Sequence, residues 1–286
     1  MVGKAPVTAV QFYDASDSCP FAAKAWLTLL EKGIQFERHT IDLKNKPKYF
    51  SDLYASINPD PAARAKVPLL IDGDKHIVES NLVAEYLDHT FPHLGPKLFP
   101  TEPFKLFKVR WFVEMFSDKF SSSLFKLLEA NSASAAEGAK QALDKGLEVL
   151  NDFTQQHGSS KNGMFFMGQY SFAEVATTPF VQRGSVALLA LRGYSVEKSI
   201  QQQNLHRLGA WLQASSLLTG DCKYGSLPSL EFLDGLFVEV SPYIANLGML
   251  KAVLDRPSNK ETKPDDDLVK SQYAEHLGHF KGHISQ

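Results

Sequence analysis

The chain has few cysteines, almost no net charge and no long apolar run. Cys19 and Cys222 are its two cysteines among 286 residues, which excludes a disulfide framework and favours a reducing compartment. Its 30 Lys and Arg residues against 32 Asp and Glu residues leave a net charge of −2. No global positive field therefore favours nucleic acid as a partner. The longest stretch without a charged side chain, Leu208–Gly220, is 13 residues long, too short to span a bilayer. The first residues carry no apolar or Arg-rich leader, so we expect a cytoplasmic protein without a membrane span.

The first 92 residues alternate between strand and helix signals. β-Branched and aromatic residues at 7–13 predict a buried strand, and the Ala- and Leu-rich segment 20–30 predicts a helix after it. The same patterns predict a strand at 35–43, a helix at 47–57, strands at 67–72 and 75–78, and a helix at 79–89. This order, βαβαββα, indicates an α/β domain.

Helical signals dominate the rest of the chain. Proline-rich residues 93–101 lack periodicity, so we place a linker there between a first domain at 1–92 and an all-helical second domain at 102–286. Helices are predicted at 104–128, 137–157, 172–191 and 196–217. Ser171 and Glu174 have the spacing of a capping box. The extended tail from Pro257 is polar, and we expect it to be mobile.

Cys19 lies between the first predicted strand and the helix that follows it. Pro20 suits the first position of a helix, because its missing N–H would be unpaired there. The unpaired N–H groups and partial positive charge of a helix start stabilise a thiolate, the reactive form of cysteine. Position 22 is alanine, so the resolving thiol of a C-x-x-C pair is missing and an external thiol must complete the turnover. On position alone, a small buried apolar residue is an equal alternative for Cys19.

Five short motifs occur in a recognisable order along this first segment. They are Cys19-Pro20-Phe21, Leu43–Pro47, Val67-Pro68, Glu79-Ser80, and Tyr86-Leu87 before Phe91-Pro92. In this order the chain resembles the cytosolic glutathione transferases, most of all the cysteine-containing omega class, and is also similar to the dehydroascorbate reductase and lambda classes. The resemblance implies a thioredoxin-like α/β domain followed by an all-α domain, and a homodimer.

The resemblance also implies roles for individual residues. Cys19 would be catalytic, and Phe21 would line the cleft beside it. Pro68 would be cis, so that Val67 offers its backbone N–H and C=O to glutathione like an added strand. Ser80 and free helix-start amides would bind the γ-glutamyl carboxylate, with Glu79 near the ammonium group. Glutathione would be the co-substrate, and no metal is expected.

The chain departs from the omega-class pattern at the site for the glycyl carboxylate of glutathione. Ile57 stands where that class usually carries a lysine, and the loop that follows is longer than usual. Arg64 or Lys66 on this loop could supply the missing cation, and a solvated side chain is the alternative for either.

Other classes of this family use tyrosine or serine to activate glutathione. Tyr13, Ser16 and Ser18 lie near the corresponding place. With a cysteine at the helix start, we expect these three to serve as turn and packing residues.

Aromatic and sulfur side chains recur on the first predicted helix of the second domain, which borders the electrophile pocket in the family. We predict Trp111 and Met115 as substrate-pocket residues, although such a row is also typical of a core. His276, His279 and His283 share one helical face, but glycines between them weaken that helix and we predict no metal site there.

The function that these patterns favour is a glutathione-dependent thiol transferase or reductase acting on small disulfides or electrophiles, including dehydroascorbate-type substrates. Cys19 would attack an oxidised or glutathionylated substrate, or itself be oxidised by it. Two alternatives stay open: a non-catalytic protein that binds glutathione or hydrophobic ligands, and a glutathione lyase acting on aromatic substrates. Glu79-Ser80 and the absence of an apolar first helix disfavour a channel-like relative.

Overall fold

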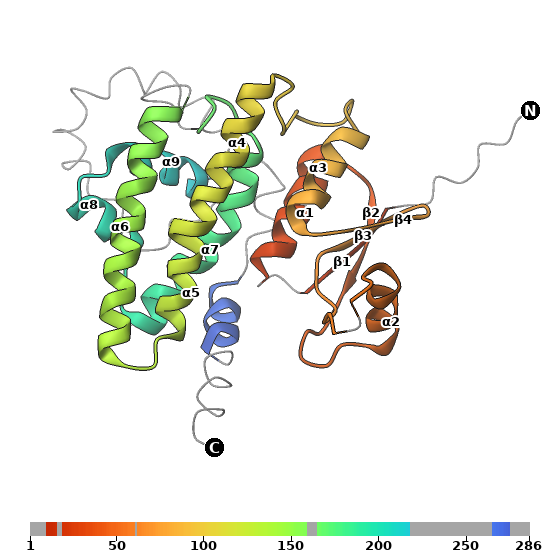
Figure 1. Cartoon of the computed structure of the whole chain (residues 1–286), viewed down its shortest axis with the longest axis horizontal. Coiled ribbons are helices and arrows are strands. Elements are labelled where there is room, and N and C mark those ends of the chain that lie inside the picture. Colours follow the sequence, from red (N-terminus) through yellow and green to blue (C-terminus); the bar gives the residue numbers. More distant parts are fainter. Residues whose placement is uncertain (1–9, 16–18, 61, 159–164, 218–264, 275–286) are drawn as a thin grey trace, which may run out of the picture.

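The computed structural model describes residues 10–15, 19–60, 62–158, 165–217 and 265–274 (Figure 1). Its sheet contains β1 (Val10–Asp14), β2 (Phe36–Thr40), β3 (Leu69–Asp72) and β4 (Lys75–Val78) in the order β2-β1-β3-β4. β1 runs parallel to β2 and antiparallel to β3, which forms a hairpin with β4. Together with α1 (Pro20–Lys32), α2 (Lys48–Ile57) and α3 (Ser80–Thr90), the strands follow the predicted order βαβαββα.

The alternation of side chains along the strands places helices on both faces of the sheet. Phe12 and Leu70 point to the face where they pack with α1 and α3. Their neighbours Tyr13 and Leu69 point to the opposite face and pack against Phe50 and Tyr54 of α2. The sheet is therefore covered on both sides, with Cys19 at the edge of the α2-side cluster.

A buried ion pair fastens the segment after α3 to this layer. Lys32 Nζ lies 2.9 Å from Asp88 Oδ1, and neither side chain is exposed. Asp88 also accepts hydrogen bonds from the backbone N–H groups of Leu98 and Phe99, at 3.0 and 3.1 Å. Gly95 lies so close to the end of α1 that a Cβ would stand 2.2 Å from the carbonyl oxygen of Glu31. The connecting segment is thus held against both helices.

The helical half contains α4 (Pro103–Phe116), the π-helical turn η1 (Ser117–Ser121), α5 (Ser122–Glu129), α6 (Ala133–His157), α7 (Phe172–Arg192), α8 (Val196–Gln202) and α9 (His206–Leu217). The predicted helix 104–128 is therefore continuous through a π turn. The prediction of one helix over 196–217 is wrong. Asn204 adopts a left-handed backbone with φ of 55°, a conformation that asparagine tolerates and that ends α8 before α9 begins.

The predicted capping box opens α7, the most deeply buried helix of this half. Ser171 Oγ accepts from the N–H of Ala173, and Glu174 Oε2 accepts from the N–H of Ser171 at 2.9 Å. Glu174 Oε1 also accepts from the N–H of Phe166 at 2.8 Å and from Trp211 Nε1 at 3.2 Å. Burial raises the pKa of this carboxyl, and its hydrogen-bond donors act in the opposite direction. The box therefore fixes α7 relative to α9 and the preceding loop.

Part of the tail that was expected to be mobile is a packed helix at 266–274, which we call the C-terminal helix (blue in Figure 1). Asp265 begins it by accepting from the N–H groups of Asp267 and Leu268, at 3.0 and 2.9 Å. Val269 is fully buried in the core of the helical half, and Tyr273 packs against the same core. Hydrophobic burial of these two side chains thus holds an otherwise polar segment in place.

The structure agrees with the predicted fold class, a four-stranded mixed sheet with helices followed by a helical remainder. α3 ends at Thr90 and α4 begins at Pro103. The division into domains at 1–92 and 102–286 stays a prediction.

Candidate active site

Cys19 occupies the position just before the first turn of α1. Its backbone is extended, with φ of −77°, and its carbonyl accepts from the N–H of Ala23 at 3.1 Å. The side chain is half-buried and packs against the cluster that contains Tyr13, Ala22 and Val67. The strand–cysteine–helix arrangement predicted from the sequence is therefore present.

Opposing effects act on the ionisation of this thiol. Burial is the largest, and it raises the pKa of Cys19. The backbone N–H groups of Ala22 and Phe21 and the cation of Arg183 lower the pKa, while Asp14 raises it further. The helix start thus acts in the direction that the sequence predicted, but burial outweighs it and the pKa of the thiol lies above its ordinary value.

The peptide bond between Val67 and Pro68 is cis, as predicted. Val67 is buried in the same cluster against which Cys19 packs. The structure therefore brings the cysteine and the cis-proline turn to one place at the end of the sheet.

The start of α3 contains the next predicted pair. Glu79 is exposed and has a left-handed backbone, with φ of 67°, a conformation that costs roughly 1–3 kcal/mol for a residue with a Cβ. Ser80 begins the helix and is 8% exposed. The turn leaves the first N–H groups of α3 without partners inside the helix, which is the geometry that binds a carboxylate.

The loop after α2 contains the candidate cations for the glycyl end of glutathione. Arg64 and Lys66 are both exposed. Ile57, at the usual lysine position, packs against the same cluster as Cys19. The role of either cation stays a prediction.

The predicted substrate-pocket residues of α4 contact other helices of the helical half. The Trp111 ring packs against Phe153 at 4.8 Å and His157 at 4.6 Å between centroids, both on α6. Met115 is half-buried against the helical core. Their contacts thus come from the helical half, whereas Cys19 packs against the sheet. A substrate-facing role for Trp111 and Met115 stays a prediction.

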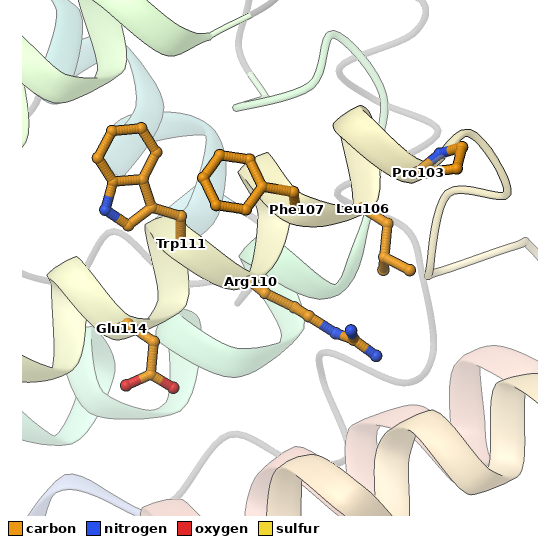
Figure 2. Close-up of a pocket in the computed structure, with 6 residues that line it drawn as sticks. All are labelled: Pro103, Leu106, Phe107, Arg110, Trp111 and Glu114. Carbon is orange, nitrogen blue, oxygen red and sulfur yellow. The ribbon is translucent and has the colours of Figure 1, made fainter.

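An open groove of about 480 Å³ runs along the exposed side of α4 (Figure 2). In Figure 2, Phe107 and Trp111 extend from one side of the helix, and Arg110 and Glu114 extend from the other. Arg110 pairs with Glu85 of α3. The residues that line the groove are Pro103, Leu106, Phe107, Arg110, Trp111 and Glu114.

Three residues near Cys19 were missed by the sequence reasoning. Arg183 of α7 is 1% exposed, and Tyr273 of the C-terminal helix interacts electrostatically with both Cys19 and Arg183. Burial raises the pKa of Tyr273 to about 12, with Cys19 acting in the same direction and Arg183 against it. Lys24, five residues after Cys19, is also buried. A lone cation inside an apolar helix was a signal for Arg183 and Lys24, whereas nothing in the polar tail marked Tyr273.

The part of the chain that the structure describes has neither a metal-ligand cluster nor a helix suited to cross a membrane. That part contains no group of three or more His, Cys, Asp or Glu side chains placed to hold a metal ion. Nor does any of its helices have the length and apolar character to cross a membrane. His276, His279, His283 and Cys222 lie outside the described residues.

Comparison with known proteins defines the family. A family model described as the N-terminal domain of glutathione S-transferase matches residues 18–90. The chain is 31% identical over 182 residues to glutathione S-transferase L2, chloroplastic, of Arabidopsis thaliana, covering 61% of this chain and 56% of that protein. It is 31% identical over 168 residues to glutathione S-transferase omega-1 of Mus musculus, covering 58% and 63%. The chain thus spans less than two thirds of the length of these two relatives.

A solved structure supports the same assignment. Glutathione transferase Omega 3C from Trametes versicolor has a TM-score of 0.59 and 26% identity, covering 74% of this chain and 86% of that chain. The chain belongs to the glutathione transferase family. Within that family it is similar to an L2 and an omega-1 glutathione S-transferase. It shares the fold of a dehydroascorbate reductase from Chlamydomonas reinhardtii, with 18% identity and a TM-score of 0.50.

Proposed function

We propose that this glutathione transferase is a thiol transferase and reductase that works through Cys19. The observation that carries the proposal is the half-buried cysteine at the start of α1, packed with the cis Val67–Pro68 turn. A thiol at this place forms a disulfide with glutathione, whereas a hydroxyl would only polarise the glutathione thiol.

Two thiol–disulfide exchanges complete the cycle. The Cys19 thiolate attacks the glutathionyl sulfur of a mixed disulfide, forms a Cys19–glutathione disulfide and releases the other partner as a thiolate, which takes up a proton. A second glutathione thiolate then attacks the glutathionyl sulfur, releases oxidised glutathione and regenerates the Cys19 thiolate. With dehydroascorbate, two glutathione molecules supply two electrons and two protons, and yield ascorbate and oxidised glutathione.

Glutathione binding is inferred for the residues that surround this thiol. Val67 would present its backbone to the cysteinyl part of the tripeptide, and Ser80 with the first amides of α3 would bind the γ-glutamyl carboxylate. Glu79 would lie near the γ-glutamyl ammonium group, and Lys66 would lie near the glycyl carboxylate. Phe21, which is 46% exposed, would line the solvent-facing side of the cleft beside Cys19.

The first test is glutathione-coupled reduction of hydroxyethyl disulfide and of dehydroascorbate by the wild type, Cys19→Ser and Cys222→Ser. Cys222 provides the matched control because it is the other cysteine of the chain. We expect activity in the wild type and in Cys222→Ser, and loss of at least a hundredfold in Cys19→Ser with glutathione still bound. A wild type that binds glutathione and reduces neither substrate would refute the reductase proposal and favour a binding protein.

We also propose a cytoplasmic homodimer. Reduced glutathione is needed in excess for the second exchange, which fits a reducing compartment. The exposed rings of Phe104, Phe107 and Trp111 form a row along α4, with 61%, 50% and 37% exposure. A contiguous apolar row of this kind is typical of a surface that another protein covers, and we assign it to a second copy of this chain.

A further inference from the structure

Lys24 is a buried cation that connects three helices around the candidate active site. Its ammonium donates a hydrogen bond to Asn81 Oδ1 of α3 at 3.0 Å. The same group lies 5.5 Å from the ring centroid of Phe21 on α1 and 5.1 Å from that of Phe180 on α7. The side chain comes from the first half of α1, and the residue is 6% exposed. One ammonium therefore contacts α1, α3 and α7 at once.

The groups that Lys24 contacts are neighbours of the residues proposed to bind glutathione. Phe21 is two residues after Cys19, and Asn81 directly follows Ser80. The rings of Phe21 and Phe180 meet edge to face, with centroids 5.1 Å apart and an interplanar angle of 90°. A cation held against both rings stabilises this arrangement.

Lys24 borders a small cavity, and the volume of this cavity shows whether it could hold a substrate or only water. Lys24, Asn81, Glu114, Ser117 and Ser121 are its polar lining residues, and its volume is about 40 Å³. A volume of this size holds one or two water molecules and is too small for a substrate. Ser117 and Ser121 are the first and last residues of η1, and such π-helical turns frequently occur at functional sites.

We propose that Lys24 is a positioning residue for glutathione: its ammonium fixes the Phe21 ring and the first turn of α3 relative to each other, and so sets the affinity for the tripeptide. This inference rests on the proposed glutathione site. Lys24 does not react with the substrate. It acts through Phe21 and through Asn81 beside Ser80, so its loss weakens glutathione binding more than it slows the exchange at Cys19.

The test compares Lys24→Met, Lys24→Arg and Lys108→Met with the wild type. Methionine keeps most of the length of the side chain and removes the charge, whereas arginine keeps the charge. Lys108 is the matched control, because its ammonium lies 5.1 Å from the ring centroid of Phe104 in the exposed row of α4. Glutathione Kd is measured by calorimetry in the Cys19→Ser background, and KM and kcat are measured with hydroxyethyl disulfide.

We expect Lys24→Met to raise the Kd and KM for glutathione at least tenfold and to lower kcat at saturating glutathione less than threefold. Lys24→Arg should stay within threefold of the wild type, and Lys108→Met within twofold. A folded Lys24→Met with unchanged Kd and KM would overturn the proposal, as would a Lys24→Arg as defective as Lys24→Met.

Two further outcomes keep this proposal separate from the proposed function. If the wild type binds glutathione without turnover, the reductase proposal fails and the Kd series still decides the role of Lys24. If Lys24→Met does not fold, Asn81→Ala removes the hydrogen-bond acceptor and leaves the lysine in place. Asn81→Ala should raise the glutathione Kd at least threefold, and an unchanged value would overturn the role of Lys24.

Discussion

The buried ammonium of Lys24 should make the stability of this protein depend on pH in a specific window. Burial lowers the pKa of Lys24 from 10.5 to about 8, although the charges of Glu114 and Cys19 act in the opposite direction. Between these two values the unfolded chain holds the proton and the folded chain has released it. The free energy of unfolding therefore rises with pH across the window. A difference of roughly 2.5 pH units at 1.36 kcal/mol each corresponds to about 3 kcal/mol.

The perturbation that isolates this effect is Lys24→Met, because every other titrating group is shared by the two proteins. Urea unfolding at pH 7.5, 8.5, 9.5 and 10.5 gives the free energy of unfolding for each. The wild type should gain about 3 kcal/mol relative to the variant from the lowest to the highest pH. Parallel pH profiles for the two proteins would refute the reasoning, since they would mean that Lys24 titrates alike in the folded and unfolded chains.

Three more predictions address the thiol, the interior and the surface. Because burial raises the pKa of Cys19, its rate of alkylation by iodoacetamide should keep rising above pH 10, where a thiol of ordinary pKa approaches its plateau; an earlier plateau would contradict this. Asp88→Asn should lower the free energy of unfolding in urea by about 3–5 kcal/mol by leaving a buried lysine without its carboxylate, whereas Asp52→Asn at an exposed pair should change it by less than about 1 kcal/mol. Phe107→Ser should shift the homodimer toward monomer in light scattering, and the exposed control Leu43→Ser should not; an unchanged dimer would remove α4 from the interface.

Local patterns were sufficient for most of the fold. β-Branched and aromatic residues predicted the strands, since the formation of a short strand depends on neighbouring residues. The Ser171–Glu174 box predicted the start of α7 to the residue, because a cap is a contact over three positions. The break between α8 and α9 was missed, since asparagine is compatible with both a helix and a left-handed turn.

Contacts between distant parts of the chain could not be predicted in the same way. Lys24 donates a hydrogen bond to Asn81, 57 positions away. Nothing in the sequence around either residue predicts that the two side chains meet. Val269 and Tyr273 are apolar residues in a polar segment, and their burial depends on a core built from other helices. Sequence patterns therefore located the candidate catalytic cysteine but not the distant side chains around it.

The position of the C-terminal helix has a consequence for the order in which the candidate active site is assembled. Ribosomes add roughly 5–20 residues per second and release the N-terminal part of a chain first. Cys19 is therefore synthesised roughly 13–50 s before Tyr273. During that interval the N-terminal part of the chain carries the thiol without the neighbours that α7 and the C-terminal helix supply. The surroundings of Cys19 are therefore complete only after the last helix that the structure describes has been synthesised.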